Sequence, residues 1–311
     1  MIMAQPGTRT SGSDSDAVDV SLAALFDEPF HIQRPFRQTV PFVLASPHSG
    51  RDYPESFVGM SRLGRISLRR SEDAFVDELF GGAVALGAPM ISARFPRAYL
   101  DANRAPSEID SAMFDGRLPV AVDSPSPRVT AGLGVIPRIV RDGAEIYRAK
   151  LSPREAELRL TRLYRPYHAA LAQLIAETRE IFGVAVVIDC HSMPSAAAIP
   201  DIVLGDRYGM AAAPLVTRAA EIAFENQGFS HARNAPYAGG YTTILHGRRD
   251  RDVHALQVEI NRGLYLDEER IERGARYEEI HHRLTAAIAH LLAIEPVLLS
   301  RNRPRQSFAA E

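Results

Sequence analysis

The sequence predicts an α/β fold with a single domain, in which a central mixed, mostly parallel sheet is flanked by helices. Two observations support this prediction: short apolar runs alternate with longer amphipathic segments, and the apolar runs end in turns or polar residues. The length of 311 residues, with 46% hydrophobic and 24% charged residues, suits one large domain. We expect a disordered leader in residues 1–20, the domain in residues 21–299 and a flexible tail in residues 300–311.

Apolar runs predict the strands, and amphipathic stretches predict the helices. The strands are expected in residues 39–50, 89–95, 184–189, 201–206 and 254–261. The helices are expected in residues 69–88, 152–183, 211–228 and 267–295. Pro166 is expected to kink or divide the second helix, since proline has no backbone N–H to donate. The stretch 101–143 is rich in Pro, Gly and Ser and has no clear period, which favours a long functional loop.

Composition limits the class of partner. The formal net charge of −2 argues against a nucleic-acid surface or a polybasic membrane anchor, so we expect a small-molecule partner, no nucleic acid and no membrane. The single cysteine, Cys190, excludes an intrachain disulfide, and no apolar run approaches the ~20 residues that span a bilayer. The N-terminus lacks a secretory signal pattern, which favours a cytoplasmic location. No feature of the sequence indicates an oligomeric state.

Polar residues follow several predicted strands, where ligands of such sheets bind. They are His48, Asp101, Asn103, Arg104 and His191. Glu259 lies inside the apolar run "LQVEIN", where a charge needs compensation for its desolvation. The sequence therefore predicts a polar site at one edge of the sheet.

Two imidazoles and one carboxylate would leave an open fourth position for water on a tetrahedral catalytic zinc. The carboxylate could come from Asp73 or Asp77, which lie four residues apart on the expected helix, although acids early in a helix also complement its dipole. A single histidine after a strand is more often structural, so His48 and His191 count mainly as a pair. Four other histidines have weaker claims: His254, His281, His282 and His290.

Seven motifs occur in one order along the chain: "PFVLASPHSG", "SEDAFVDELF", "RAYLDANRAP", "LYRPYH", "DCHSMPS", "GGYTT" and "HALQVEINRGLYL". This ordered set, from residue 41 to residue 266, resembles the N-formylglutamate amidohydrolase family. The resemblance implies a fold similar to zinc carboxypeptidases, of the phosphorylase/hydrolase-like type. It also implies a metal-dependent hydrolase of linear amide C–N bonds, which releases formate and glutamate in histidine degradation.

The resemblance implies roles for individual residues. His48, Asp73 and His191 match the ligand positions for one Zn²⁺ ion with an open water position, with Asp77 as the competing or supporting carboxylate. Glu259 matches the catalytic carboxylate that takes a proton from the metal-bound water; the alternative is a buried ion-pair partner of an arginine.

Asp189 is expected to orient a ligand histidine, while the alternation of the strand turns Cys190 to the opposite side.

Substrate contacts are expected from "LDANR" and "GGYTT". Arg104 offers a planar fork for a carboxylate, and Asn103, Tyr241 and Thr243 offer hydrogen bonds. Asp101 is expected to hold Arg104 or Arg97 in place. The chain carries Ile244 where an arginine is typical of the family, so Arg128 or Arg138 in the long loop would have to replace that charge.

Three functions remain open from the sequence. The first is a zinc-dependent amidohydrolase of N-formyl-L-glutamate or a related N-acyl amino acid. The second is a carboxypeptidase-like metallohydrolase of peptide or glutamyl linkages, and the third is a non-catalytic relative that binds an amino acid. Glu259 argues against the third function, and release of formate distinguishes the first from the second.

Overall fold

A computed structural model describes residues 19–140, 143–196 and 198–299. It confirms the predicted α/β class: seven strands form one mixed sheet in the order β1-β3-β2-β4-β7-β5-β6. The four central strands run parallel to one another, while β1 and the pair β5-β6 run antiparallel to their neighbours at the two edges. The strands are β1 (Phe30–Gln33), β2 (Phe42–Ser46), β3 (Met90–Ala93), β4 (Ala185–Met193), β5 (Ile202–Gly205), β6 (His231–Arg233) and β7 (Val253–Asn261).

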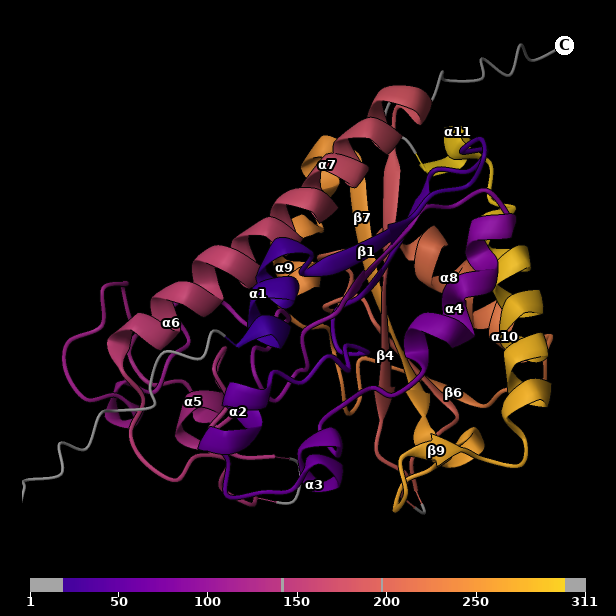
Figure 1. Ribbon diagram of the computed structural model, residues 1–311. Coiled ribbons are helices and arrows are strands. Elements are labelled where there is room, and N and C mark those ends of the chain that lie inside the picture. Colours follow the sequence, from indigo (N-terminus) through magenta and orange to yellow (C-terminus); the bar gives the residue numbers. More distant parts are fainter. Residues whose placement is uncertain (1–18, 141–142, 197, 300–311) are drawn as a thin grey trace, which may run out of the picture.

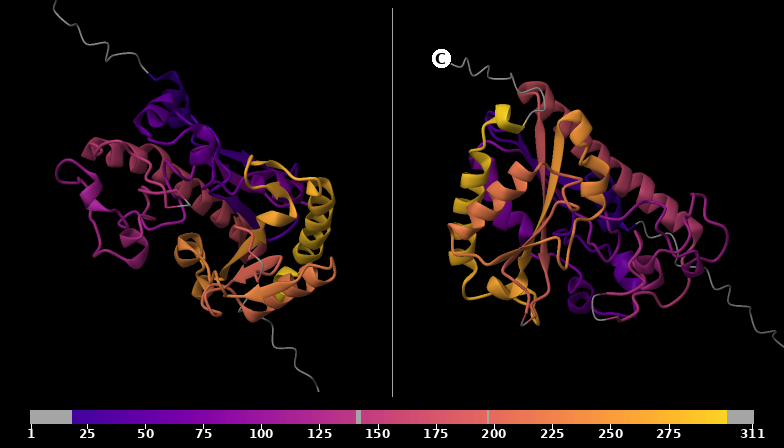
Figure 2. Two further views of the ribbon diagram at one scale, coloured as in Figure 1. Left: turned by 90° about the horizontal axis from the view of Figure 1, so that it is seen from below. Right: turned by 180° about the vertical axis from the view of Figure 1, so that it is seen from behind.

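Helices cover both faces of the sheet (Figures 1 and 2). One face packs against α4 (Val76–Ala85), α8 (Pro214–Glu225) and α10 (Tyr277–Leu292). The other face packs against α7 (Arg165–Phe182) and the long loop that begins at residue 101. The shorter helices are α1 (Val20–Asp27), α2 (Glu55–Met60), α3 (Arg65–Arg69), α5 (Pro127–Thr130), α6 (Pro153–Arg159), α9 (Tyr241–His246) and α11 (Pro296–Leu299).

Two apolar cores lie on opposite faces of the sheet because side chains alternate along each strand. On β4, Val186, Ile188 and Cys190 pack in the core under α4, α8 and α10, whereas Ala185 and Val187 pack in the core under α7. The alternation therefore turns Cys190 away from its polar neighbours, as predicted. None of the described helices is both long and apolar enough to cross a membrane.

Several boundaries differ from the prediction. Strand β4 does not end at Asp189 but runs on to Met193, because it stays paired with β7 as far as Asn261. Helix α4 begins only at Val76, since Phe75 before it has a left-handed φ of 62°. Asp73 therefore lies in the loop before the helix. It does not share a helical face with Asp77, although the sequence predicted that both residues would lie on that helix.

The C-terminal stretch also begins differently. Residues 267–276 were expected to be helical, but they contain the short pair β8 (Leu266–Asp267) and β9 (Glu272–Arg273) before α10 begins. The carboxylate of Asp267 accepts backbone hydrogen bonds from Glu269 and Arg270, which favours a turn over a helix at this point.

The division of the long helix near Pro166 is confirmed. A π-helical turn at Leu160–Tyr164 separates α6 from α7.

The terminal segments lie mostly outside the described residues. Residues 1–18 and 300–311 hold nearly all of the predicted leader and tail. Asp19 and Val20, which the prediction placed in the leader, belong to the start of α1, where the Asp19 carboxylate accepts a hydrogen bond from the Leu22 N–H.

Candidate active site

The register of β4 and β7 sets four polar side chains side by side. His191 pairs with Glu259, and Asp189 pairs with Gln257, at the carboxyl ends of these parallel strands. All four follow the alternation of Val187 and Ala255, so they project from the sheet face that α7 covers. This is the edge of the sheet where the sequence predicted a site.

Two loops, one after β2 and one before α4, bring in two more residues. His48 follows the strand by two positions, and its backbone carbonyl accepts a hydrogen bond from the Asp73 N–H at 3.0 Å. Gly50 lets this loop pass close to the next strand, because a Cβ there would lie 2.1 Å from the Phe95 carbonyl oxygen. The chain thus fixes His48 and Asp73 next to each other, although they are distant in sequence.

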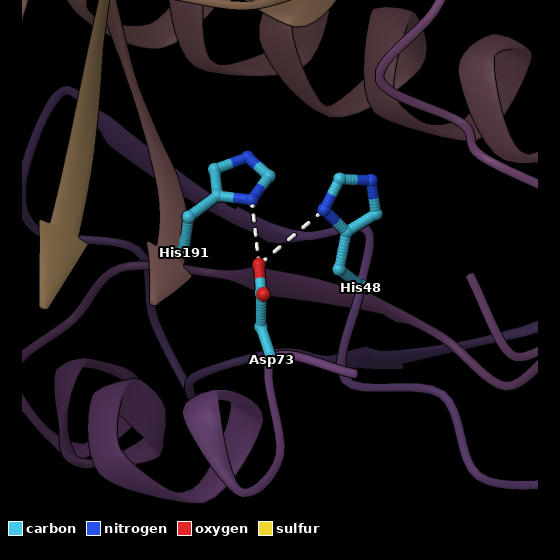
Figure 3. A group of neighbouring side chains, drawn as sticks. All are labelled: His48, Asp73 and His191. Carbon is cyan, nitrogen blue, oxygen red and sulfur yellow. Dashed lines mark hydrogen bonds and ion pairs between the residues drawn. The ribbon is translucent and has the colours of Figure 1, made fainter. Parts of the chain in front are cut away.

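The side chains of His48, Asp73 and His191 converge (Figure 3). One donor atom from each residue lies within 4.8 Å of the other two, and all three side chains are buried. Asp73 Oδ2 lies 2.9 Å from His191 Nδ1 and 3.3 Å from His48 Nδ1. Two imidazole nitrogens and one carboxylate oxygen are a donor set that suits Zn²⁺.

Two further carboxylates hold the outer nitrogens of the histidines. Asp101 Oδ1 lies 2.7 Å from His48 Nε2, and Asp189 Oδ2 lies 3.0 Å from His191 Nε2. A proton on each Nε2 leaves each Nδ1 with a free lone pair directed at the common centre. Within the described ranges, the buried His48 Nδ1 forms no hydrogen bond and only the ion-pair contact with Asp73 Oδ2 at 3.3 Å, as expected for a nitrogen that binds a metal.

Asp73 and Asp77 have separate surroundings. The second oxygen of Asp73 accepts a hydrogen bond from Arg262 Nη2 at 2.8 Å. Asp77 lies 3.5 Å from Arg51 on a more exposed part of the surface and does not belong to the convergent group. The geometry therefore favours Asp73 over Asp77 as the carboxylate of the site.

The charges around the centre shift the pKa values of the acids in different directions. Burial alone would raise the pKa of Asp73, but the two histidines and Arg262 hold it well below its usual range. Burial also opposes ionisation of Asp101, yet Arg104, His48 and Arg97 keep its pKa well below the ordinary value.

Glu259 behaves differently from these acids. Burial raises the pKa of Glu259 to about 7, although His191 acts in the opposite direction. The Gln257 side-chain amide donates a hydrogen bond to Glu259 Oε1 at 2.8 Å. A carboxylate whose pKa lies near neutrality can both accept and return a proton.

A cavity of about 380 Å³ opens beside the convergent group. Its polar lining includes His48, Asp101, Asn103, Arg104, His191, Gln257 and Glu259. Arg104 is buried, and its guanidinium donates to the backbone carbonyls of Leu133 and Asn103. Arg104, which was predicted from the sequence, therefore lines the cavity. Its Nη2 donates to neither of these two carbonyls.

Asn103 is occupied by the protein itself. Its amide oxygen accepts a hydrogen bond from the Thr242 N–H at 2.8 Å, and its amide nitrogen lies 3.3 Å from Asp189 Oδ2. Gly240 permits this approach, since a Cβ there would lie 2.3 Å from Asn103 Nδ2. Asn103 Nδ2 also lies 3.0 Å from His191 Nε2, so these contacts hold Asn103 between α9 and the site, in the lining of the cavity.

Tyr241, Thr243 and Ile244 are not among the residues that line the cavity. Thr243 is buried and donates to the Gly240 carbonyl, while the Tyr241 ring packs edge-on against His168. Ile244 is 47% exposed on α9.

Gln257 and Tyr237 are among the lining residues that were not predicted from the sequence. Gln257 precedes Glu259 by two positions, so the alternation of the strand would have placed it on the same face. Tyr237 lies in an irregular segment after Pro236, where no periodic pattern is available to find it.

Fold and site together define the chain as a hydrolase of α/β architecture. It belongs to the N-formylglutamate amidohydrolase family, whose model matches residues 40–266. N-formylglutamate deformylase of Pseudomonas aeruginosa is 30% identical over 243 residues, which cover 75% of this chain and 85% of that protein.

Two further similarities agree with this result. N-formylglutamate deformylase of Pseudomonas putida is 28% identical over 241 residues, covering 74% of this chain and 83% of that protein. The crystal structure of N-formylglutamate amidohydrolase from Ralstonia eutropha JMP134 superposes with a TM-score of 0.80 at 33% identity, covering 85% of this chain and 97% of the other.

Proposed function

We propose that this chain is a zinc-dependent amidohydrolase that cleaves the C–N bond of N-formyl-L-glutamate or a related N-acyl amino acid. The observation that carries the proposal is the convergence of His48, Asp73 and His191 at a cavity that Glu259 also lines, in a chain of this family. The products would be the free amino acid and formate, or the corresponding carboxylate.

The donor set fits a single zinc ion held by the two Nδ1 atoms and Asp73 Oδ2. Such an ion lowers the pKa of a bound water and polarises a substrate carbonyl. The chain's own part is to prepare the donors: Asp101 and Asp189 keep the proton of each histidine on Nε2, and Arg262 fixes the orientation of the Asp73 carboxylate.

Glu259 is the proposed general base. Gln257 occupies Oε1, which leaves Oε2 to take a proton from the attacking water. The water oxygen bonds to the formyl carbon, the C–N bond breaks, and Glu259 returns the proton to the amine nitrogen that leaves. Its pKa of about 7 matches both halves of this transfer near neutral pH.

Arg104 is the proposed anchor for a carboxylate of the substrate. Its Nε and Nη1 are held by backbone carbonyls, so the guanidinium plane is fixed before the substrate binds. Asn103, which lines the same cavity, positions Asp189, His191 and α9.

Formate production tests the proposal. We expect zinc-loaded protein to release formate from N-formylglutamate, protein stripped of metal by a chelator to release none, and added zinc to restore the reaction. Release of amino acids from peptides or γ-glutamyl compounds, with no formate from any N-formyl amino acid, would instead support the carboxypeptidase-like function. Full activity after metal removal would contradict the zinc requirement.

A further inference from the structure

Positive charge exceeds negative charge along the lining of the cavity. Five arginines but only two carboxylates line it. Arg262 is bound to Asp73 and to Ser192, and Arg97 donates to Asp101, so these two arginines are already paired within the site. A surplus of arginine in a partly enclosed cavity favours a ligand with more than one negative charge.

Arg128 differs from the other charged residues in the lining. It lies on α5, is exposed to solvent, and its guanidinium forms no hydrogen bond or ion pair with any residue of the described ranges. Asp123, the nearest acid before it in the sequence, accepts a hydrogen bond from Ser107 Oγ, and Glu108 accepts hydrogen bonds from the Ala105 N–H and from Ser126 Oγ. The charge of Arg128 is therefore available to a ligand.

The backbone ties Arg128 to Arg104. The Leu133 N–H donates to the Arg128 carbonyl at 2.8 Å, and the Leu133 carbonyl accepts from Arg104 Nε at 3.0 Å. Burial lowers the pKa of Arg104, and the charges of Arg97 and Arg128 lower it further, which agrees with this proximity. Leu133 thus links an arginine inside the cavity to one at its exposed side.

Apolar side chains from the same loop complete this wall. Leu133, Pro137 and Ile139 line the cavity, and α5 is anchored beneath by the buried side chain of Val129. A short aliphatic chain could lie against this wall with one carboxylate at Arg104. A second carboxylate at the end of that chain would then reach toward Arg128.

We propose that Arg128 binds the side-chain carboxylate of the substrate and so selects N-acyl amino acids with an acidic side chain. The inference rests on the proposed hydrolysis at the same site and adds the residue that determines specificity. Arg128 takes no part in the bond cleavage itself. Its contribution is a charge-assisted hydrogen bond to the end of the substrate that does not react.

Three substrates distinguish the contributions of the two carboxylates to recognition. N-formylglutamate carries both, N-formylglutamine lacks the side-chain charge, and N-formylisoglutamine lacks the α-carboxylate charge. We expect Arg128→Met to lower the kcat/KM preference for N-formylglutamate over N-formylglutamine about 10- to 100-fold, the size of one lost charged hydrogen bond. The preference over N-formylisoglutamine should stay as in the unmodified protein.

Three further variants serve as controls. Arg117→Met removes an exposed arginine of the same loop that does not line this cavity, so both preferences should be unchanged. Arg128→Lys should recover part of the lost preference, because an ammonium keeps the charge but not the fork. Arg138 pairs with Asp110 and Glu145, so Arg138→Met should leave the selectivity in place.

A binding measurement separates this inference from the proposed hydrolysis. In the Glu259→Gln background, calorimetry should give a similar fall in the affinity for N-formylglutamate when Arg128→Met is added, with little change for N-formylglutamine. If the unmodified protein releases no formate, the proposed hydrolysis fails, and this calorimetry still decides the role of Arg128. An unchanged ratio of affinities, or an equal loss in Arg117→Met or Arg138→Met, would overturn the assignment.

Discussion

The two faces of the sheet use the same strands for different purposes. On the face covered by α4, α8 and α10, the side chains of β4 stay apolar from Val186 to Cys190. On the opposite face, Val187 is followed by Asp189 and His191. Strand β7 changes at the same level, from Ala255 to Gln257 and Glu259, because the two strands are parallel and in register. From Val186 to Cys190 one face therefore supports the fold, while the other divides into core and site.

The division has an energetic cost on the site face. Asp73, Asp101, Asp189 and Glu259 are all buried there, and buried carboxylates are unfavourable unless partners compensate for their lost hydration. Histidines and arginines supply these partners, and a bound cation would add to them. We therefore expect substitutions on the site face to change activity and the pH dependence of stability, and substitutions on the other face to change stability alone.

The largest effect is expected at Glu259. Glu259→Gln keeps the size of the side chain but cannot accept a proton, so kcat should fall by about 10²- to 10⁴-fold with KM nearly unchanged. Stopped assays of formate release, beside zinc content and thermal unfolding, measure the effect. An enzyme of full activity, or a variant that has simply unfolded, would contradict the proposed role.

A core substitution on the opposite face should lower stability and leave the activity of the folded protein unchanged. Phe224 is fully buried on α8, and Phe224→Ala should lower the free energy of unfolding by roughly 3 to 5 kcal/mol. Chemical denaturation measures this loss, and the exposed Phe36→Ala serves as a control with little expected change. Zinc content and kcat/KM should persist in both variants at temperatures where they are folded. A loss of zinc from folded Phe224→Ala would show that the two faces are not separate.

A smaller effect concerns acid stability beneath the site. Burial and the charge of the neighbouring His168 together lower the pKa of His246 to about 4. The unfolded chain binds a proton at this residue near pH 6.5 and the folded chain does not, so the free energy of unfolding should fall as the pH drops from 6.5 to 4. His246→Gln should remove up to roughly 3 kcal/mol of that fall. Urea unfolding at several pH values measures it, with exposed His290→Gln as control; an equal pH dependence in both variants would refute it.

Local sequence patterns were sufficient for the parts of the molecule that depend on alternation. The apolar runs predicted β2, β3, β4, β5 and β7, and the same alternation predicted the direction of Cys190. The residues of the convergent group were also named from the sequence, because His48 and His191 lie close to strand ends. Each of these features depends only on residues that are neighbours along one strand.

Features that depend on contacts between distant segments were not predicted. The left-handed Phe75 moves Asp73 off the helix, and the hydrogen bond from Thr242 to Asn103 turns that amide toward the protein. Tyr241 and Thr243 are not among the residues that line the cavity, and the Tyr241 ring instead packs against His168 of α7, a residue distant in sequence. No periodicity in one segment reports how a second segment will approach it.

Zinc stoichiometry in paired aspartate variants tests the central claim most directly. Asp73, and not Asp77, lies with the two histidines at the end of the sheet. We expect one zinc ion per chain in the unmodified protein and in Asp77→Asn, and at least a tenfold weaker affinity in Asp73→Asn, measured by metal analysis and competition with a chelating dye. Retention of tightly bound zinc by Asp73→Asn together with its loss from Asp77→Asn would contradict the account.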